Sequence, residues 1–214
     1  GFDAALVFVF DTRFSRQSAG EFLDRLTAGF GRVASVSVGA TFVFGRGREG
    51  TVELLRRRGA ESGFAVHGIP PLEQDGEIVS SRRVRAALEA GEMGEVTACL
   101  GRYFCVRGPV VKGDQRGRTI GFPTANIAVW DELLLPANGV YATYIWIGEA
   151  RHLAATNVGV RPTVNGMKLT VEAHILDFDA DIYGEDVRLE FVRRVRPEMK
   201  FAGLGALKAQ IAAD

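Results

Sequence analysis

Cysteine, net charge and long apolar runs are scarce in this 214-residue sequence, and each shortage argues against a class of protein. The two cysteines, Cys99 and Cys105, fit neither a zinc motif nor a redox dithiol, so we expect two free thiols in a reducing cytosol. Lys plus Arg and Asp plus Glu balance at 26 each, which argues against nucleic acid as a partner. No apolar run reaches membrane-spanning length and no signal peptide is visible, so we predict a cytoplasmic protein with no membrane partner.

An initiating methionine and early histidines are also missing. The chain opens with Gly1 and Phe2 and runs at once into the apolar stretch 4–10, which we predict to be a buried strand. None of its three histidines precedes His67. A start of this kind leads us to expect a chain that begins in the middle of a domain.

The first hundred residues alternate short apolar runs with helix-like segments, which is typical of a parallel α/β sheet. Ser18 is placed to cap the first helix, with Glu21 three residues on. Besides 4–10, strands are predicted at 33–38, also buried, and at 64–69. Helices are predicted at 18–30, 50–58 and 80–90, with one more ending near residue 100.

From Tyr103 the pattern changes to many short strands separated by Gly, Pro, Asn and Asp, which indicates an antiparallel barrel or sandwich. In 169–176 apolar residues alternate with Thr170, Glu172 and His174. A closing helix is predicted at 204–213. We therefore predict two domains, 1–101 and 102–214. The predicted strands of the second domain are 103–111, 140–147, 152–158, 169–176 and 187–195.

A glycine-rich segment follows the first strand of the second half. Its glycines are interleaved with cations, and backbone N–H groups that approach closely, together with cations, suit phosphate oxygens. No Gly-Lys-Ser/Thr follows at the spacing of a P-loop. On spacing alone, a phosphate cradle and an ordinary glycine-rich hairpin with a solvated basic face are equally good interpretations. The residues concerned are Gly108, Lys112, Gly113, Arg116, Gly117, Arg118 and Gly121.

Within that segment, Pro123, Thr124 and Asn126 offer hydroxyl and amide oxygens of the kind that suits Mg²⁺. Pro, Thr and Asn are also common turn formers, and taken alone these residues favour a turn.

The run from Gly121 to Ile127 resembles the signature of riboflavin kinases. Further segments match that family in the expected order, so that the resemblance covers essentially all of 102–214. They are 135–142 (LPANGVYA), 157–163 (NVGVRPT), 171–178 (VEAHILDF), 183–184 (YG) and 196–201 (RPEMKF).

The resemblance implies a small Greek-key β-barrel with a C-terminal helix, an enzyme that transfers the γ-phosphate of ATP to riboflavin, and FMN as product. It implies Thr124 and Asn126 as ligands of Mg²⁺ and of nucleotide phosphate, and Glu172 as the catalytic base. The implied flavin-binding residues are Glu172, Arg161 and Arg196. The glycine segment becomes a flap over ATP. The implied ATP-binding residues are Gly108, Lys112, Gly113, Arg116, Gly117, Gly121, Thr124 and Asn126.

The chemistry supports the same assignment of Glu172. A primary alcohol is a poor nucleophile, and a carboxylate within hydrogen-bond reach can take its proton during attack on the γ-phosphorus. Phosphoryl transfer otherwise needs positioning and charge neutralisation. Periodicity alone would place a strand glutamate on a solvated outer face, and only the flanking match reverses that interpretation.

The first half resembles the Rossmann-like FMN adenylyltransferase domain that often precedes riboflavin kinase in bacteria. The matching segments are 39–50 and 78–85, in which Ser80, Ser81 and Arg85 would form a vestigial nucleotide site. The bland interpretation is a capped helix with a solvated basic face. The family's His-x-Gly-His segment is absent and Arg82 replaces the usual Thr, so we expect this chain, as given, not to make FAD.

Three alternatives remain open beside a riboflavin kinase that takes only small-molecule substrates. The first is a bifunctional riboflavin kinase and FAD synthetase that lacks its first segment here. The second is a non-catalytic flavin- or nucleotide-binding module. The third is a β-barrel that binds nucleic acid, which the neutral charge and the lack of aromatic clustering on a basic face argue against.

Overall fold

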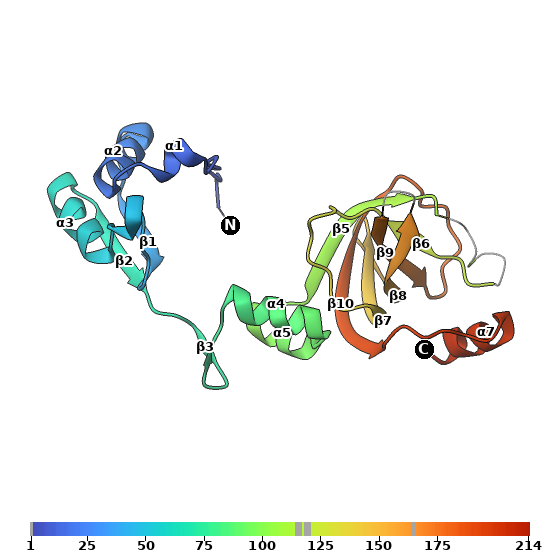
Figure 1. Cartoon of the computed structure of the whole chain (residues 1–214). Coiled ribbons are helices and arrows are strands. Elements are labelled where there is room, and N and C mark those ends of the chain that lie inside the picture. The colour runs from blue at the N-terminus through green and yellow to red at the C-terminus, as the bar shows by residue number, and fades with distance from the viewer. Residues whose placement is uncertain (1, 114–116, 118–120, 164–165) are drawn as a thin grey trace. The chain divides into compact units, whose positions relative to one another are not determined.

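The chain forms two compact units, Gly1–Glu73 and Gln74–Asp214. This computed structural model describes residues 2–113, 117, 121–163 and 166–214, and within them it does not describe the side chains of 30, 161–163, 166–168 and 212. Figure 1 shows the element order, and each unit is described by itself.

The first unit is a small α/β arrangement, as predicted. Strands β1 (Ser35–Gly39) and β2 (Ala65–Ile69) pair in parallel, and α3 (Val52–Ser62) lies between them in sequence. Helix α2 (Ala19–Phe30) begins with the expected capping box, in which the Glu21 carboxylate accepts from the Ser18 backbone N–H at 2.8 Å. The short helices are α1 (Thr12–Ser15) and η1 (Arg46–Arg48). Ala19, Leu23, Phe44 and Leu55 form its core.

Two expectations for this unit are wrong. Residues 4–10 form no strand, and the Val7 and Val9 side chains are 88% and 81% exposed. An apolar run becomes a strand only where a neighbour takes its backbone hydrogen bonds, and among the described residues β1 and β2 pair with each other and not with it. The strand predicted at 33–38 exists as β1, but its residues alternate between exposed and half-buried, so it is not buried.

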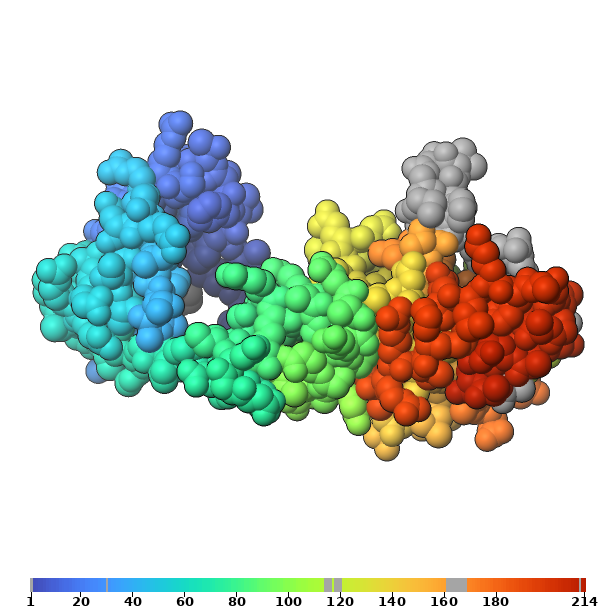
Figure 2. Space-filling view, turned by 60° about the horizontal axis from the view of Figure 1, so that its bottom comes forward, coloured from blue at the N-terminus to red at the C-terminus, as the bar shows by residue number. Residues whose placement is uncertain are grey.

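The second unit opens with a small hairpin, β3 (Glu73–Gln74) and β4 (Glu77–Ile78), followed by two helices, α4 (Ser81–Ala90) and α5 (Met93–Leu100). Arg83 joins them, because its Nε donates to Glu95 at 2.5 Å while its Nη1 donates to the backbone carbonyls of Gln74 and Glu77. The helices pack against the barrel that follows (Figures 1 and 2). Their buried residues Ala87, Leu88, Met93 and Val96 belong to the same core as the barrel interior.

The predicted antiparallel barrel is present and closed, with strand order β10-β5-β6-β9-β8-β7. Strands β7, β8 and β9 follow one another as hairpins, and β10 returns to lie beside β7, which is the expected Greek key. The C-terminal helix α7 (Leu204–Ala213) is confirmed. The strands are β5 (Phe104–Val111), β6 (Ala125–Ile127), β7 (Gly139–Ile147), β8 (Ala150–Thr163), β9 (Gly166–Ile175) and β10 (Asp186–Arg196).

Alternation along the strands sorts side chains between the barrel interior and its outer face. On β9, Val171, Ala173 and Ile175 are buried, while Glu172 and His174 are half-buried. This confirms the period-two pattern of the sequence. Other interior residues are Val106, Val110, Ile127, Tyr141, Ile145, Val158, Val187, Leu189 and Phe191.

One polar pair lies inside this apolar barrel. The hydroxyls of Thr143 on β7 and Thr156 on β8 are 2.7 Å apart, and Thr143 also lies 3.0 Å from the carbonyl oxygen of Ala154. Both threonines are at most 2% exposed. Because buried hydroxyls are costly without partners, the pair stabilises the barrel only when β7 and β8 are in this register.

Aromatic rings and arginines do cluster on one outer face of the barrel, although that face is not purely basic. On the outer face of β7, β8 and β10, the Arg188 guanidinium lies 4.5 Å from the Trp146 ring centre and that of Arg151 lies 4.4 Å from Tyr144. These arginines and aromatic rings lie on neighbouring strands, so their contacts could not be predicted from their spacing in the sequence. Carboxylates line the adjoining grooves, so the face carries both signs of charge. They are Glu149, Asp186 and Glu190.

Cys99 and Cys105 are both free thiols, as expected. No helix within the described part of the chain is long and apolar enough to cross a membrane.

Candidate active site on the outer face of the barrel

Three polar side chains form a row across strands β6, β9 and β8. Asn126 on β6 stands opposite Glu172 on β9, and Asn157 on β8 stands opposite Glu172 on its other side. Residues directly opposite in an antiparallel pair share a face, with Cβ atoms about 5 Å apart. The sequence neighbours of the row point into the barrel, so the row itself lies on the outer face. Those buried neighbours are Ala125, Ile127, Thr156, Val158, Val171 and Ala173.

Two described glycines of this segment, Gly113 and Gly117, lie close to the predicted metal ligands Asn126 and Thr124. A Cβ atom on Gly113 would lie 2.5 Å from the Asn126 Nδ2, and one on Gly117 would lie 2.3 Å from the Phe122 carbonyl oxygen and 3.4 Å from the Thr124 hydroxyl. Glycine at both positions therefore permits a contact that any other residue would disturb. The phosphate-cradle interpretation gains from this proximity, because the backbone approaches the two predicted metal ligands.

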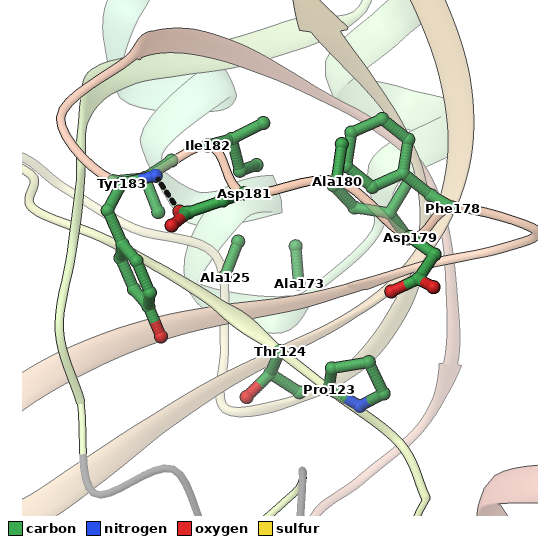
Figure 3. Close-up of a pocket in the computed structure, with 12 residues that line it drawn as sticks. Pro123, Thr124, Ala125, Ala173, Phe178, Asp179, Ala180, Asp181, Ile182 and Tyr183 are labelled. Atoms are coloured by element: carbon green, nitrogen blue, oxygen red, sulfur yellow. Dashed lines mark hydrogen bonds between the residues drawn. The ribbon is translucent and has the colours of Figure 1, made fainter.

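A pocket of about 390 Å³ opens beside Thr124 (Figure 3). Its floor consists of small and branched apolar side chains from the barrel, and its rim is the segment between β9 and β10. In that rim the Asp181 carboxylate accepts from the Tyr183 backbone N–H at 3.0 Å. The lining residues are Val110, Pro123, Thr124, Ala125, Ala173, Ile175, Phe178, Asp179, Ala180, Asp181, Ile182 and Tyr183.

Thr124 alone of the three central predicted residues lines this pocket. Asn126 and Glu172 lie one step away on the outer face, joined to Thr124 through β6 and its pairing with β9.

Lys112 lies at the rim of the pocket beside Thr124, and His174 lies next to Pro123, which also lines the pocket. The Lys112 ammonium lies 5.8 Å from the centre of the Tyr183 ring, which places a cation at the pocket rim. The His174 Nδ1 lies 2.8 Å from the Pro123 carbonyl oxygen, and its ring meets Phe122 edge-on. His174 thus holds the backbone at Pro123, directly before Thr124. Sequence spacing indicated only that His174 shares a strand face with Glu172.

Several predicted residues lie elsewhere or outside the description. Gly108 is on β5, lines a separate groove with Trp146, and packs against the Ala128 carbonyl oxygen, which a Cβ would meet at 1.8 Å. Gly121 has a φ of +87°, which favours glycine. Arg116 and the Arg161 side chain lie outside the described residues.

Arg196 has a well-defined partner at the end of the chain. Its Nε and Nη2 donate to the two carboxylate oxygens of Asp214 at 2.7 and 2.6 Å, and Gln210 donates to the same carboxylate at 2.9 Å. Burial alone would raise the pKa of Asp214, but the hydrogen bonds from Arg196 and Gln210 outweigh it and hold that pKa below its usual range. The guanidinium therefore fastens α7 to β10. Its predicted contact with flavin stays a prediction.

The vestigial nucleotide residues Ser80, Ser81 and Arg85 are all exposed at the start of α4. The Ser80 hydroxyl accepts from the Arg83 backbone N–H at 3.3 Å, which is an ordinary N-cap. The capped-helix interpretation thus describes the contact that is present.

The donor set near Thr124 fits Mg²⁺ better than a transition metal. Among the described residues, no group of three or more His, Cys, Asp or Glu side chains is close enough to hold a metal. Thr124 and Asn126 instead supply neutral, hard oxygens, and Mg²⁺ usually completes its shell with water and phosphate oxygens. Two neutral ligands therefore suit an ion that arrives with a nucleotide.

Comparisons with known proteins identify the relatives of this chain. The model of the riboflavin kinase family matches residues 100–214, and that of the FAD synthetase family matches residues 1–83. A bifunctional riboflavin kinase/FMN adenylyltransferase from Escherichia coli (strain K12) is 40% identical over the whole chain, which covers 68% of that protein. The protein of the same name from Haemophilus influenzae is 36% identical over 99% of the chain and 69% of its own length.

A solved structure from Streptococcus pneumoniae, titled a macrolide-efflux protein, matches with a TM-score of 0.86 and 34% identity. It covers 96% of this chain and 66% of its own. The chain thus spans about two thirds of the length of these relatives. Two family matches and two relatives alike along its whole length establish that the chain belongs to the riboflavin kinase family, among the bifunctional riboflavin kinase/FMN adenylyltransferases.

Proposed function

We propose that the chain transfers the γ-phosphate of ATP to the 5′-hydroxyl of riboflavin in a Mg²⁺-dependent reaction that yields FMN and ADP. The observation that carries the proposal is the juxtaposition of Glu172, Asn126 and Gly113 on the outer face of the barrel, near the pocket that Thr124 lines. The family match supports the same reaction.

In the proposed reaction the Glu172 carboxylate accepts the proton of the 5′-hydroxyl. The hydroxyl oxygen forms a bond to the γ-phosphorus, and the bond from that phosphorus to the β,γ-bridging oxygen breaks, so that ADP leaves. Thr124 and Asn126 would hold Mg²⁺, which when bound neutralises phosphate charge. The backbone at Gly113 and Gly117, close to both ligands, would cover the phosphates and exclude water.

The pocket beside Thr124 is the proposed place of the nucleoside part of ATP. Its small apolar floor at Ala125 and Ala173 leaves room for a flat ring, and the rim supplies Tyr183 and two carboxylates (Figure 3). Lys112, at the rim, would then face the phosphates as they leave the pocket toward Asn126. Gly108 stays in the predicted ATP-binding set only as a residue of the same segment, since its groove is a different one.

A direct test is to incubate the purified chain with riboflavin, ATP and Mg²⁺ and to separate riboflavin, FMN and FAD by chromatography. We expect FMN to accumulate and FAD to be absent, because the chain as given has no histidine before His67. FAD formation would instead favour the bifunctional alternative, which the FAD synthetase match over 1–83 supports. Tight flavin binding without FMN would mean a non-catalytic module.

A further inference from the structure

Glu198 extends the row beyond Asn157, on the side away from Asn126. Asn157, on β8, stands opposite Glu172, and its Nδ2 donates to the Glu198 Oε1 at 3.5 Å, the long end of hydrogen-bond distance. Glu198 lies in the segment after β10, so a second carboxylate from a distant part of the chain reaches the row. No pattern in the sequence singled out either residue by itself.

Gly159 supplies an independent sign that this approach is built into the fold. It lies two residues after Asn157 on β8 and therefore on the same face. A Cβ atom on Gly159 would lie 2.4 Å from the Glu198 Oε1 and 3.1 Å from the Asn157 Nδ2. The missing side chain leaves the space that the Glu198 carboxylate occupies, so the strand is shaped to admit it.

We propose that Asn157 and Glu198 are positioning residues that hold the Glu172 carboxylate in the orientation needed to take the riboflavin proton. This inference rests on the proposed function. An amide Nδ2 carries two hydrogens. One hydrogen is directed at Glu198, and in the proposal the other is assigned to the cross-strand neighbour Glu172, whose Cβ atom is about 5 Å from that of Asn157.

Orientation matters because a general base acts only within hydrogen-bond reach of the proton it removes. Glu172 is half-buried on the outer face and stands between Asn126 and Asn157 in the cross-strand register. In the proposal these two neighbours limit the rotamers of the Glu172 side chain. Glu198 acts one step further out, by fixing Asn157, and so touches neither the reacting hydroxyl nor the phosphates.

The test uses the full chain with the substitutions Asn157→Ala, Glu198→Ala, Glu198→Gln and Gly159→Ala, and measures kcat and KM for riboflavin and for ATP. We expect Asn157→Ala, Glu198→Ala and Gly159→Ala each to lower kcat about tenfold with both KM values within about twofold. Glu198→Gln keeps the accepting oxygen and should stay within about twofold of the wild-type kcat. The double variant Asn157→Ala/Glu198→Ala should be no slower than either single variant, because the pair acts as one unit.

Glu149→Ala is the matched control, because it removes an exposed carboxylate from the turn between β7 and β8, away from the row. Unfolding temperatures of all variants separate a loss of positioning from a loss of folded protein. The inference is overturned by wild-type kcat in the alanine variants, by a loss confined to KM, or by losses that multiply in the double variant. A wild-type chain that makes no FMN overturns the proposed function and this inference together, whereas an active wild type with unaffected variants overturns the inference alone.

Discussion

At the scale of single residues, the proposed chemistry depends on Glu172, a strand glutamate of a kind that usually faces solvent. We predict that Glu172→Gln lowers kcat for FMN formation by about 10²–10⁴-fold, because the isosteric amide cannot accept the hydroxyl proton. Mg·ATP binding should be retained, since the predicted nucleotide contacts lie on β6, the glycine segment and the pocket. FMN formation and a nucleotide titration measure the two effects, and an undiminished rate would remove Glu172 from the role of base.

A second prediction concerns the contact between Gly113 and Asn126. Asn126→Ala removes the proposed metal oxygen, and Gly113→Ala places a methyl group 2.5 Å from the Asn126 Nδ2, so both variants should need more Mg·ATP for half-maximal rate. Gly205→Ala is a matched control, because nothing lies within 4 Å of a Cβ there. Rate against Mg²⁺ concentration is the measurement. Curves that superimpose on the wild type would exclude Asn126 as a metal ligand.

Sequence reasoning found Thr124, Asn126 and Glu172 only with the help of family resemblance, since each fits a turn or a solvated strand equally well. Asn157 and Glu198 lie in two of the matched segments, 157–163 and 196–201, but their contact was not predicted, for a physical reason. Their meeting depends on the register of β8 against β9 and on the path of the chain after β10, neither of which is written in local spacing.

At the scale of elements, the last helix is held by one buried ion pair. The Arg196 and Asp214 side chains are 14% and 4% exposed and share two hydrogen bonds. We predict that Asp214→Asn destabilises the chain by about 1.5–3 kcal/mol, the usual contribution of a charged hydrogen bond. Thermal or denaturant unfolding measures the loss. Glu149→Gln, in an exposed turn, should leave stability unchanged.

The same pair has a pH signature. Because the folded state lowers the pKa of Asp214, its contribution is complete above the unfolded pKa of about 3.9 and is lost as the pH falls through the lower folded value. Wild-type stability should therefore fall more steeply below about pH 4 than that of Asp214→Asn. Parallel acid limbs in the two proteins would contradict this assignment.

Strands and helices with strong periodicity were predictable, and the exceptions have identifiable causes. The three-residue strand β6, at 125–127, is too short to show alternation, and its Pro-Thr-Asn context favoured a turn. Residues 4–10 have the composition of a strand but no strand neighbour among the described residues. A strand forms only where a neighbouring strand takes its backbone hydrogen bonds, whereas a helix such as α2 is indicated by its own capping residues.

At the scale of the molecule, the predicted boundary between residues 101 and 102 marks a real change of pattern, and as a domain boundary it stays a prediction. Packing favours including 74–101 with the barrel, because Leu88, Met93 and Val96 share its core. We predict that a fragment 102–214 is less stable than 74–214 by on the order of 5 kcal/mol, from about 1.5–3 kcal/mol per buried apolar side chain. Denaturant unfolding of both fragments measures this, and coinciding midpoints would support the boundary at 101/102.

The two-part organisation was predictable because strands that alternate with helices give way to successive strands. The packing of α4 and α5 against the barrel could not be predicted. The sequence of an amphipathic helix pair shows that it has a buried face, but not which neighbour covers that face. The Ser80 segment resembles part of the adenylyltransferase, yet the helix that it caps belongs to the compact unit of the barrel.

The two threonine hydroxyls sealed inside the barrel bear on catalysis without approaching any substrate. If β8 slipped by one residue against β7, Asn157 would turn inward and Thr156 outward, and the Thr143 hydroxyl would lose its partner in an apolar interior. The slipped register is disfavoured because it leaves a hydroxyl unpaired in the core. The register that is present keeps Asn157 opposite Glu172 on the outer face. The buried hydroxyl pair thus helps to keep the proposed base in line with its neighbour from inside the barrel, without contacting any substrate.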